Sequence, residues 1–99
     1  MIPWIEKLLQ TPIDDYRKNA VNLILAPYLM NVKELCYDTA LKIINSWLVK
    51  CGKLRQLDKD FDYIARYALK YSSKNGYKPI KLDTLRIKNY ILYNNIKHS

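Results

Sequence analysis

The chain has 99 residues and carries 17 lysines and arginines against 9 aspartates and glutamates, a formal net charge of +8 at pH 7. This length suits one domain with a single modest core, and no stretch approaches the ~20 apolar residues of a membrane-spanning helix. Two glycines and four prolines leave too few turns for an all-β protein, so we predict a single all-α domain over residues 1–99. The positive charge favours a nucleic acid, a nucleotide or an acidic partner.

The sequence offers few groups for catalysis or metal binding. Cys36 and Cys51 are far apart and His98 is the single histidine, so we expect no metal site, no iron–sulfur cluster and no nucleophile–histidine pair. We expect both cysteines to be buried as small apolar side chains. Gly52 and Gly76 stand alone, outside any glycine-rich phosphate loop. The chain is therefore predicted not to be an enzyme. Because its start lacks the pattern of a signal peptide, we expect it in the cytoplasm.

The first two predicted helices cover residues 2–10 and a longer stretch, residues 11–33. In the second, Thr11 suits the N-cap and Pro12 the first helical position. The second half of this stretch is apolar on every side, which indicates that the helix enters the core. Pro27 lacks a backbone donor, so we expect the helix to be kinked or broken there.

Arg17 interrupts the apolar side of this long helix, where it lies beside Val21 and Ile24 on the wheel. A guanidinium in such a place extends to solvent, pairs with a buried carboxylate or binds an anion. Its rigid fork of N–H donors suits phosphate. The sequence leaves two interpretations open: a structural ion pair with an aspartate, and a phosphate-binding arginine.

The third predicted helix covers residues 37–51, because apolar side chains fill one broad arc of its wheel. Trp47 lies in this arc, so we expect it in the core rather than at the surface as a stacking platform. Gly52 fits the position just after the helix end. Residues 82–94 mix their apolar positions and are predicted as one last helix, which makes five helices in all.

The fourth predicted helix begins at Asp58 or Asp60 and runs to about Ser72. The side opposite its core face carries Tyr63, Arg66, Tyr67 and Lys70. Aromatic rings interleaved with cations suit a nucleotide or a single strand, because bases stack on rings while phosphates meet the charges. The other interpretation is a solvated face whose tyrosines are partly covered by neighbouring elements.

Three stretches together resemble a known family: IDDYRKNAVNLILAPYLMNVK, LCYDTALKIINSWLVKC and FDYIARYALKYSSKNGYKPIKLDTL. They are similar to PriX, the small non-catalytic third subunit of crenarchaeal DNA primase. They also resemble the helix-bundle domains that follow the catalytic domain in archaeal plasmid primase-polymerases. The likeness covers nearly the whole chain, and its most specific piece is the step Asp15-Tyr16-Arg17 that leads into LILAPYL.

The resemblance implies an all-helical domain similar to the C-terminal domain of the primase large subunit. That domain carries four cysteines and an iron–sulfur cluster, so the two cysteines here imply a cluster-free version. The family's role is to bind the initiating nucleoside triphosphate, with Mg²⁺, and in some members the single-stranded DNA template. The implied partners are the catalytic and large primase subunits, or an attached primase-polymerase domain. The resemblance also implies a natural chain that extends before Met1.

The resemblance further implies a set of site residues. Arg17 matches the acid-x-Arg motif, Asn31 follows it in the same Asn-Val step, and Arg66 and Lys70 fall in a region where basic site residues are expected. The implied nucleotide- or DNA-binding set is Arg17, Asn31, Tyr63, Arg66, Tyr67 and Lys70. The alternative is a general single-stranded nucleic-acid-binding or assembly domain without a nucleotide pocket.

Overall fold

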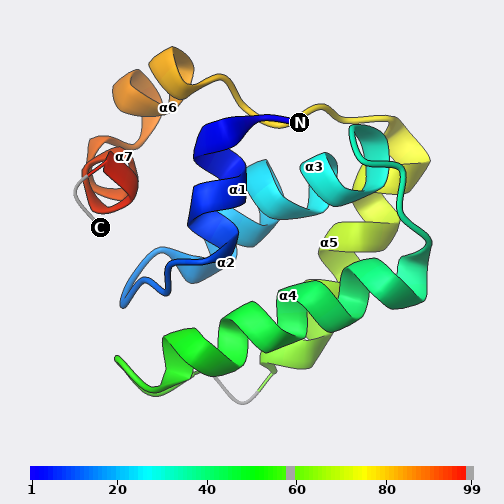
Figure 1. The fold of residues 1–99 in the computed structure, drawn as a ribbon, viewed down its shortest axis with the longest axis horizontal. Helices are drawn as coiled ribbons and strands as arrows, with labels where there is room; N and C mark the ends of the chain where they lie inside the picture. The colour runs from blue at the N-terminus through cyan, green and yellow to red at the C-terminus, as the bar shows by residue number, and fades with distance from the viewer. Residues whose placement is uncertain (58–59, 98–99) are drawn as a thin grey trace.

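Helices make up all the regular secondary structure of the computed structural model, which describes residues 1–57 and 60–97 (Figure 1). The elements are α1 (Pro3–Leu9), α2 (Arg17–Ala20), η1 (Val21–Leu25), α3 (Ala26–Asn31), α4 (Tyr37–Gly52), α5 (Phe61–Asn75), α6 (Leu82–Lys88) and α7 (Tyr90–Lys97). Because α2, η1 and α3 follow one another without a break, they form one continuous helix, which we call the central helix. The all-α prediction is confirmed for these residues, with six helices rather than five. Asp58 and His98 lie outside the described residues.

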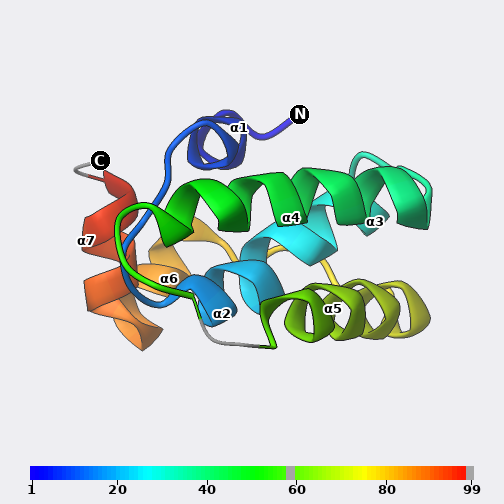
Figure 2. The same cartoon turned by 90° about the horizontal axis from the view of Figure 1, so that it is seen from below.

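The other helices are arranged around the central helix (Figures 1 and 2). The α5 helix packs against α3, η1 and α4, α1 contacts η1, and α6 and α7 pair with each other. Trp47 and Tyr28 are the largest fully buried side chains, so the prediction that Trp47 lies in the core is confirmed. The radius of gyration of 12.3 Å is close to the ~13 Å expected for 100 residues.

The central helix begins at Arg17, so the predicted start at Thr11 and Pro12 is wrong. The Thr11 hydroxyl instead donates a hydrogen bond to a carbonyl at the end of α1. The Thr11 carbonyl accepts one from Trp47 Nε1 at 3.1 Å. Tyr16 then adopts a left-handed conformation with φ of 57°, which a continuous helix could not contain. Long-range bonding of the Thr11 backbone has therefore overridden a locally favourable cap.

Pro27 does not end the central helix, which continues to Asn31. The expected interruption takes the form of a π-helical segment, η1, immediately before the proline. Proline has no N–H for the carbonyl four residues back, that of Leu23. This carbonyl accepts a hydrogen bond from the backbone N–H of Ile80 at 3.0 Å instead. The group released by the proline thus attaches the α5–α6 connection to the central helix.

Three other boundaries differ from the prediction. Gly52 is the last residue of α4 rather than the residue after it. The α5 helix runs beyond its predicted end to Asn75, where Gly76 with φ of 64° forms a left-handed cap. The single last helix is divided at Asn89, whose side-chain oxygen accepts the N–H of Leu92 at 3.1 Å. An asparagine that bonds its own backbone in this way competes with helical bonding and separates α6 from α7.

The two cysteines differ in environment. Cys51 is buried as predicted, and burial raises the pKa of its thiol. Cys36 is exposed at the residue before α4, so its predicted burial is wrong, and hydrogen bonds from Thr39 lower the pKa of its thiol. No three histidine, cysteine or acidic side chains gather as a metal site in residues 1–57 and 60–97. No helix in the same ranges is long and apolar enough to cross a membrane.

Candidate functional site

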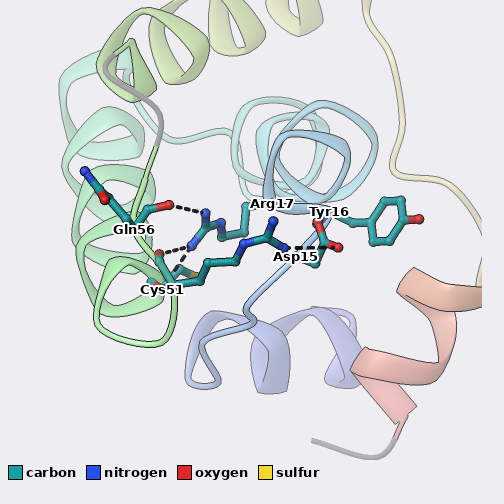
Figure 3. Close-up of polar contacts among 6 residues, drawn as sticks. Asp15, Tyr16, Arg17, Cys51 and Gln56 are labelled. Carbon is teal, nitrogen blue, oxygen red and sulfur yellow. Dashed lines mark hydrogen bonds and ion pairs between the residues drawn. The ribbon is translucent and has the colours of Figure 1, made fainter.

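Arg17, the first residue of the central helix, binds the end of α4 through its guanidinium (Figure 3). Nη1 donates hydrogen bonds to the carbonyls of Cys51, at 3.1 Å, and Arg55, at 2.5 Å. Nη2 donates to the Gln56 carbonyl at 2.9 Å. The last carbonyls of a helix carry partial negative charge, which suits a cation. The guanidinium therefore holds carbonyls rather than an aspartate, and Asp15 pairs with the Arg55 side chain at 3.5 Å.

Two adjoining grooves lie between the start of the central helix and the start of α5. The larger, about 280 Å³, is lined by Asp15, Tyr16, Arg17, Lys18, Asn19, Leu48, Leu57, Phe61 and Ile64. The smaller, about 180 Å³, is lined by Lys18, Asn22, Asp60, Tyr63, Ile64 and Tyr67. Lys18 and Ile64 line both, so the grooves share a wall. Each groove alone is smaller than the ~300–1,000 Å³ of typical small-molecule sites.

A row of exposed tyrosines extends from the smaller groove along α5. Ring centroids are 6.1 Å apart for Tyr63 and Tyr67, 5.6 Å for Tyr67 and Tyr71, and 5.5 Å for Tyr71 and Tyr77. The first three follow the i, i+4 spacing that places side chains on one helix face. Tyr71 was not among the residues predicted from the sequence, although this spacing could have identified it. Tyr77, which lies beyond the helix end, was not predicted either. We call these four residues the tyrosine row.

Arg66 and Lys70 lie on α5 next to the tyrosine row, on the side of α4. Arg66 Nε donates to the Asp62 carboxylate at 2.8 Å, and both side chains are half exposed. This guanidinium holds the pKa of Asp62 below its usual value, with a smaller contribution from the Asn45 amide of α4. Lys70 Nζ lies 5.9 Å from the ring centroid of Tyr37, also on α4. Neither cation lines the two grooves.

Asn31 connects the end of the central helix to the segment after α5. Its amide nitrogen donates to the carbonyls of Ser72, at 2.9 Å, and Tyr77, at 2.5 Å. Its own carbonyl accepts from Lys78 Nζ at 2.9 Å. Asn31 therefore has a clear structural role and does not line either groove.

The grooves bring together only part of the residue set that the sequence predicted. Arg17 lines the larger groove, and Tyr63 and Tyr67 line the smaller one. The grooves also contain Lys18 and Asn22, which were not predicted from the sequence as site residues. Their i, i+4 spacing on the polar side of the central helix was a signal for a shared surface, but nothing in it indicated that α5 lies opposite.

Fold and site together define a small, basic, all-helical domain with an aromatic and cationic surface site. In a comparison with protein families, the family model described as Primase X (PriX) matches residues 2–99 of the chain. The chain belongs to this family, which confirms the resemblance seen in the sequence. Membership indicates a primase-related role. None of the curated proteins compared with the chain matches it.

Proposed function

We propose that this chain is a non-catalytic primase subunit or domain that binds the initiating nucleoside triphosphate while a catalytic partner joins the first two nucleotides. Membership of the Primase X family supports the primase-related role. The observation that carries the nucleotide proposal is the pair of adjacent grooves, in the smaller of which Lys18 of the central helix lies with the exposed Tyr63 and Tyr67 of α5. The chain would act in the cytoplasm beside the catalytic and large primase subunits.

The triphosphate would occupy the larger groove. Lys18 is exposed in the first turn of the central helix and lines both grooves, so its ammonium reaches a phosphate from either side. The partial positive charge of a helix start also favours an anion. Arg17 adds positive charge at the wall, although its main contribution is to hold the end of α4 in place. Mg²⁺ would arrive with the triphosphate, as is usual for nucleotides.

The nucleoside would occupy the smaller groove. Tyr63 and Tyr67 offer aromatic surface on which a base can stack. The Asn22 amide donates and accepts hydrogen bonds, and the Asp60 carboxylate accepts them, so the two suit base edges and ribose hydroxyls. Arg66 and Lys70 lie outside both grooves, on the side of α5 where a longer ligand would continue.

A thermal-shift and NMR titration with MgATP tests this proposal. A ligand that binds only the folded chain raises its stability by mass action, so MgATP should protect it more than inorganic phosphate does. Lys18→Gln should weaken MgATP binding by about tenfold or more, because a hydrogen bond to a charged group is worth ~1.5–3 kcal/mol. The matched control is Lys88→Gln, an exposed lysine on α6 away from the grooves.

Two results would count against the nucleotide proposal. One is MgATP protection no greater than that given by inorganic phosphate. The other is equal weakening by the two lysine variants, which would indicate attraction by overall charge. Either result would favour the alternative, a helical nucleic-acid-binding or assembly domain without a nucleotide pocket.

A further inference from the structure

A third groove, which we call the α1–α4 groove, has walls formed by α1, the end of the central helix and α4. Its volume of about 380 Å³ exceeds that of either groove described above, and it shares no lining residue with them. In Figure 2, α1 lies above α4 and α5 lies below it, so this groove is on the side of α4 that faces α1. We infer that the α1–α4 groove is the docking site for an acidic amphipathic helix of a partner protein. The inference does not rest on nucleotide binding.

One edge of the α1–α4 groove is a line of polar side chains on α4. Lys42, Ser46 and Lys50 follow one another at intervals of four residues, so they lie along one face of the helix, and all three are exposed. Within residues 1–57 and 60–97, no acidic side chain forms an ion pair with either lysine. The two lysines are ~12 Å apart along the helix axis. This edge therefore carries two unneutralised cations at a defined spacing.

The acidic side chain that lines the groove is already neutralised. Glu6 accepts a hydrogen bond from the Tyr28 hydroxyl and pairs with Lys33 at 3.2 Å, and these two contacts lower the pKa of its carboxyl. The charge that remains for a ligand is that of Lys42 and Lys50. Because these lysines are ~12 Å apart along α4, a ligand that meets both needs two separate anionic groups rather than one phosphate or carboxylate.

The inner side of the groove is apolar. Leu9 of α1 and Ile43 of α4 are half-buried there, and the buried Leu29 and Trp47 lie beneath them. The Trp47 indole N–H already donates to backbone carbonyls of Leu8 and Thr11. Since this side chain is 1% exposed, its ring offers no face to a base. Aliphatic contact without a stacking surface favours a protein segment over a nucleic acid.

An amphipathic helix meets both requirements. On such a helix, acidic residues at i and i+7 lie on one face about 10 Å apart, and leucines at i+3 and i+4 lie between them. The leucines would contact Leu9 and Ile43 while the acidic residues pair with Lys42 and Lys50, which is the helix-in-groove mode of recognition. A second copy of this chain suits the groove poorly, because each copy carries a net charge of +8.

A labelled model peptide tests the inference. It has glutamates at i and i+7, leucines at i+3 and i+4, and alanine and glutamine elsewhere. Fluorescence anisotropy measures its affinity, and the amide NMR signals of Leu9, Ile43 and Ser46 should shift on binding. Each exposed ion pair contributes up to about fivefold, so Lys42→Gln/Lys50→Gln should weaken binding by about 2- to 25-fold. The matched control is Lys81→Gln/Lys88→Gln, which removes two exposed lysines at the start and end of α6 and should leave the affinity nearly unchanged.

A second peptide separates docking from attraction by charge alone. Replacing both leucines by serine keeps the acidic residues and leaves the protein unaltered, and it should weaken binding by about tenfold or more. Equal binding of the two peptides overturns the inference, as does equal weakening by the two pairs of lysine substitutions. Amide shifts on α5 instead of α1 and α4 also overturn it. So does displacement of the labelled peptide by oligothymidylate as readily as by unlabelled peptide, which would assign the lysines to a nucleic acid. MgATP protection tests the proposed function alone.

Discussion

Replacing Arg17 by alanine removes one hydrogen bond that joins the start of the central helix to the end of α4 and two that join it to the segment after α4. The bond to the Cys51 carbonyl is partly buried, whereas those to Arg55 and Gln56 are exposed. The Cys51 carbonyl also accepts the backbone N–H groups of Leu54 and Arg55, so it keeps partners after the change, and water can replace the donor at the two exposed carbonyls. The expected cost is therefore the loss of the charged hydrogen bonds themselves, chiefly the partly buried one.

The magnitude follows from these environments. A partly buried bond from a charged donor contributes ~1.5–3 kcal/mol, and loss of a cation near the α4 C-terminus costs a further ~0.3–1 kcal/mol. We take the lower part of this range, because Arg17 is only half-buried, and expect a loss of about 2 kcal/mol in the free energy of unfolding. For a domain of this size 1 kcal/mol shifts Tm by ~4–8 °C, so Tm should fall by about 8–16 °C.

Thermal and urea unfolding measure this loss, with Arg55→Ala as the control. The Arg55 side chain makes only an exposed ion pair with Asp15, worth ~0–1 kcal/mol, and its carbonyl survives the change. Arg17→Lys should recover less than half of the loss, because lysine keeps the charge but lacks the fork. An Arg17→Ala variant as stable as the wild type would refute this structural role, and so would an equal loss in Arg55→Ala.

Three further outcomes are expected. In a reconstituted primase, Lys18→Gln should reduce primer initiation by about tenfold while elongation of a supplied primer stays unchanged; an equal fall in both rates would count against the nucleotide role. The Tyr28 hydroxyl, followed by Lys33, holds the pKa of Glu6 below 4.5. The ionised Glu6 therefore stabilises the fold above about pH 4.5, and this stabilisation is lost as pH falls through the pKa of the folded state. Glu6→Gln should flatten the acid-unfolding curve in this range, and an unchanged curve would refute this. Asn31→Ala removes two hydrogen bonds, although the Ser72 carbonyl keeps the backbone N–H of Tyr77, and should cost ~0.5–1.5 kcal/mol, with faster amide exchange around the α5–α6 connection; unchanged exchange would show that Asn31 does not hold that segment.

The helices that local pattern determines were predictable, and those that depend on distant contacts were not. The α4 helix shows a clear apolar arc and was placed within one residue, with Trp47 correctly in the core. The start of the central helix was misplaced, because Thr11 and Pro12 form a good local cap while the Trp47 indole, far along the chain, binds the Thr11 carbonyl. Single-sequence patterns contain no information about such a partner.

The same distinction applies to the site. Tyr63 and Tyr67 were found from spacing within one helix. That Lys18 lies beside them depends on how two helices pack, which wheel positions do not reveal. The partners of Arg17 were also missed, because they are backbone carbonyls, and every residue has one whatever its side chain.

The π-helical segment has a consequence for the alignment of the groove. Ala26 donates its N–H to the Val21 carbonyl five residues back, so this turn contains one residue more than an α-helical turn. One residue corresponds to ~100° of rotation about a helix axis. Deleting a residue between Val21 and Leu25 would rotate Lys18 by about that angle relative to α3, which packs on α5. The extra residue therefore sets the direction about the helix axis in which the cations of the central helix point relative to the tyrosines of α5. A related chain without this extra residue would need its cations at other sequence positions to face the same tyrosines.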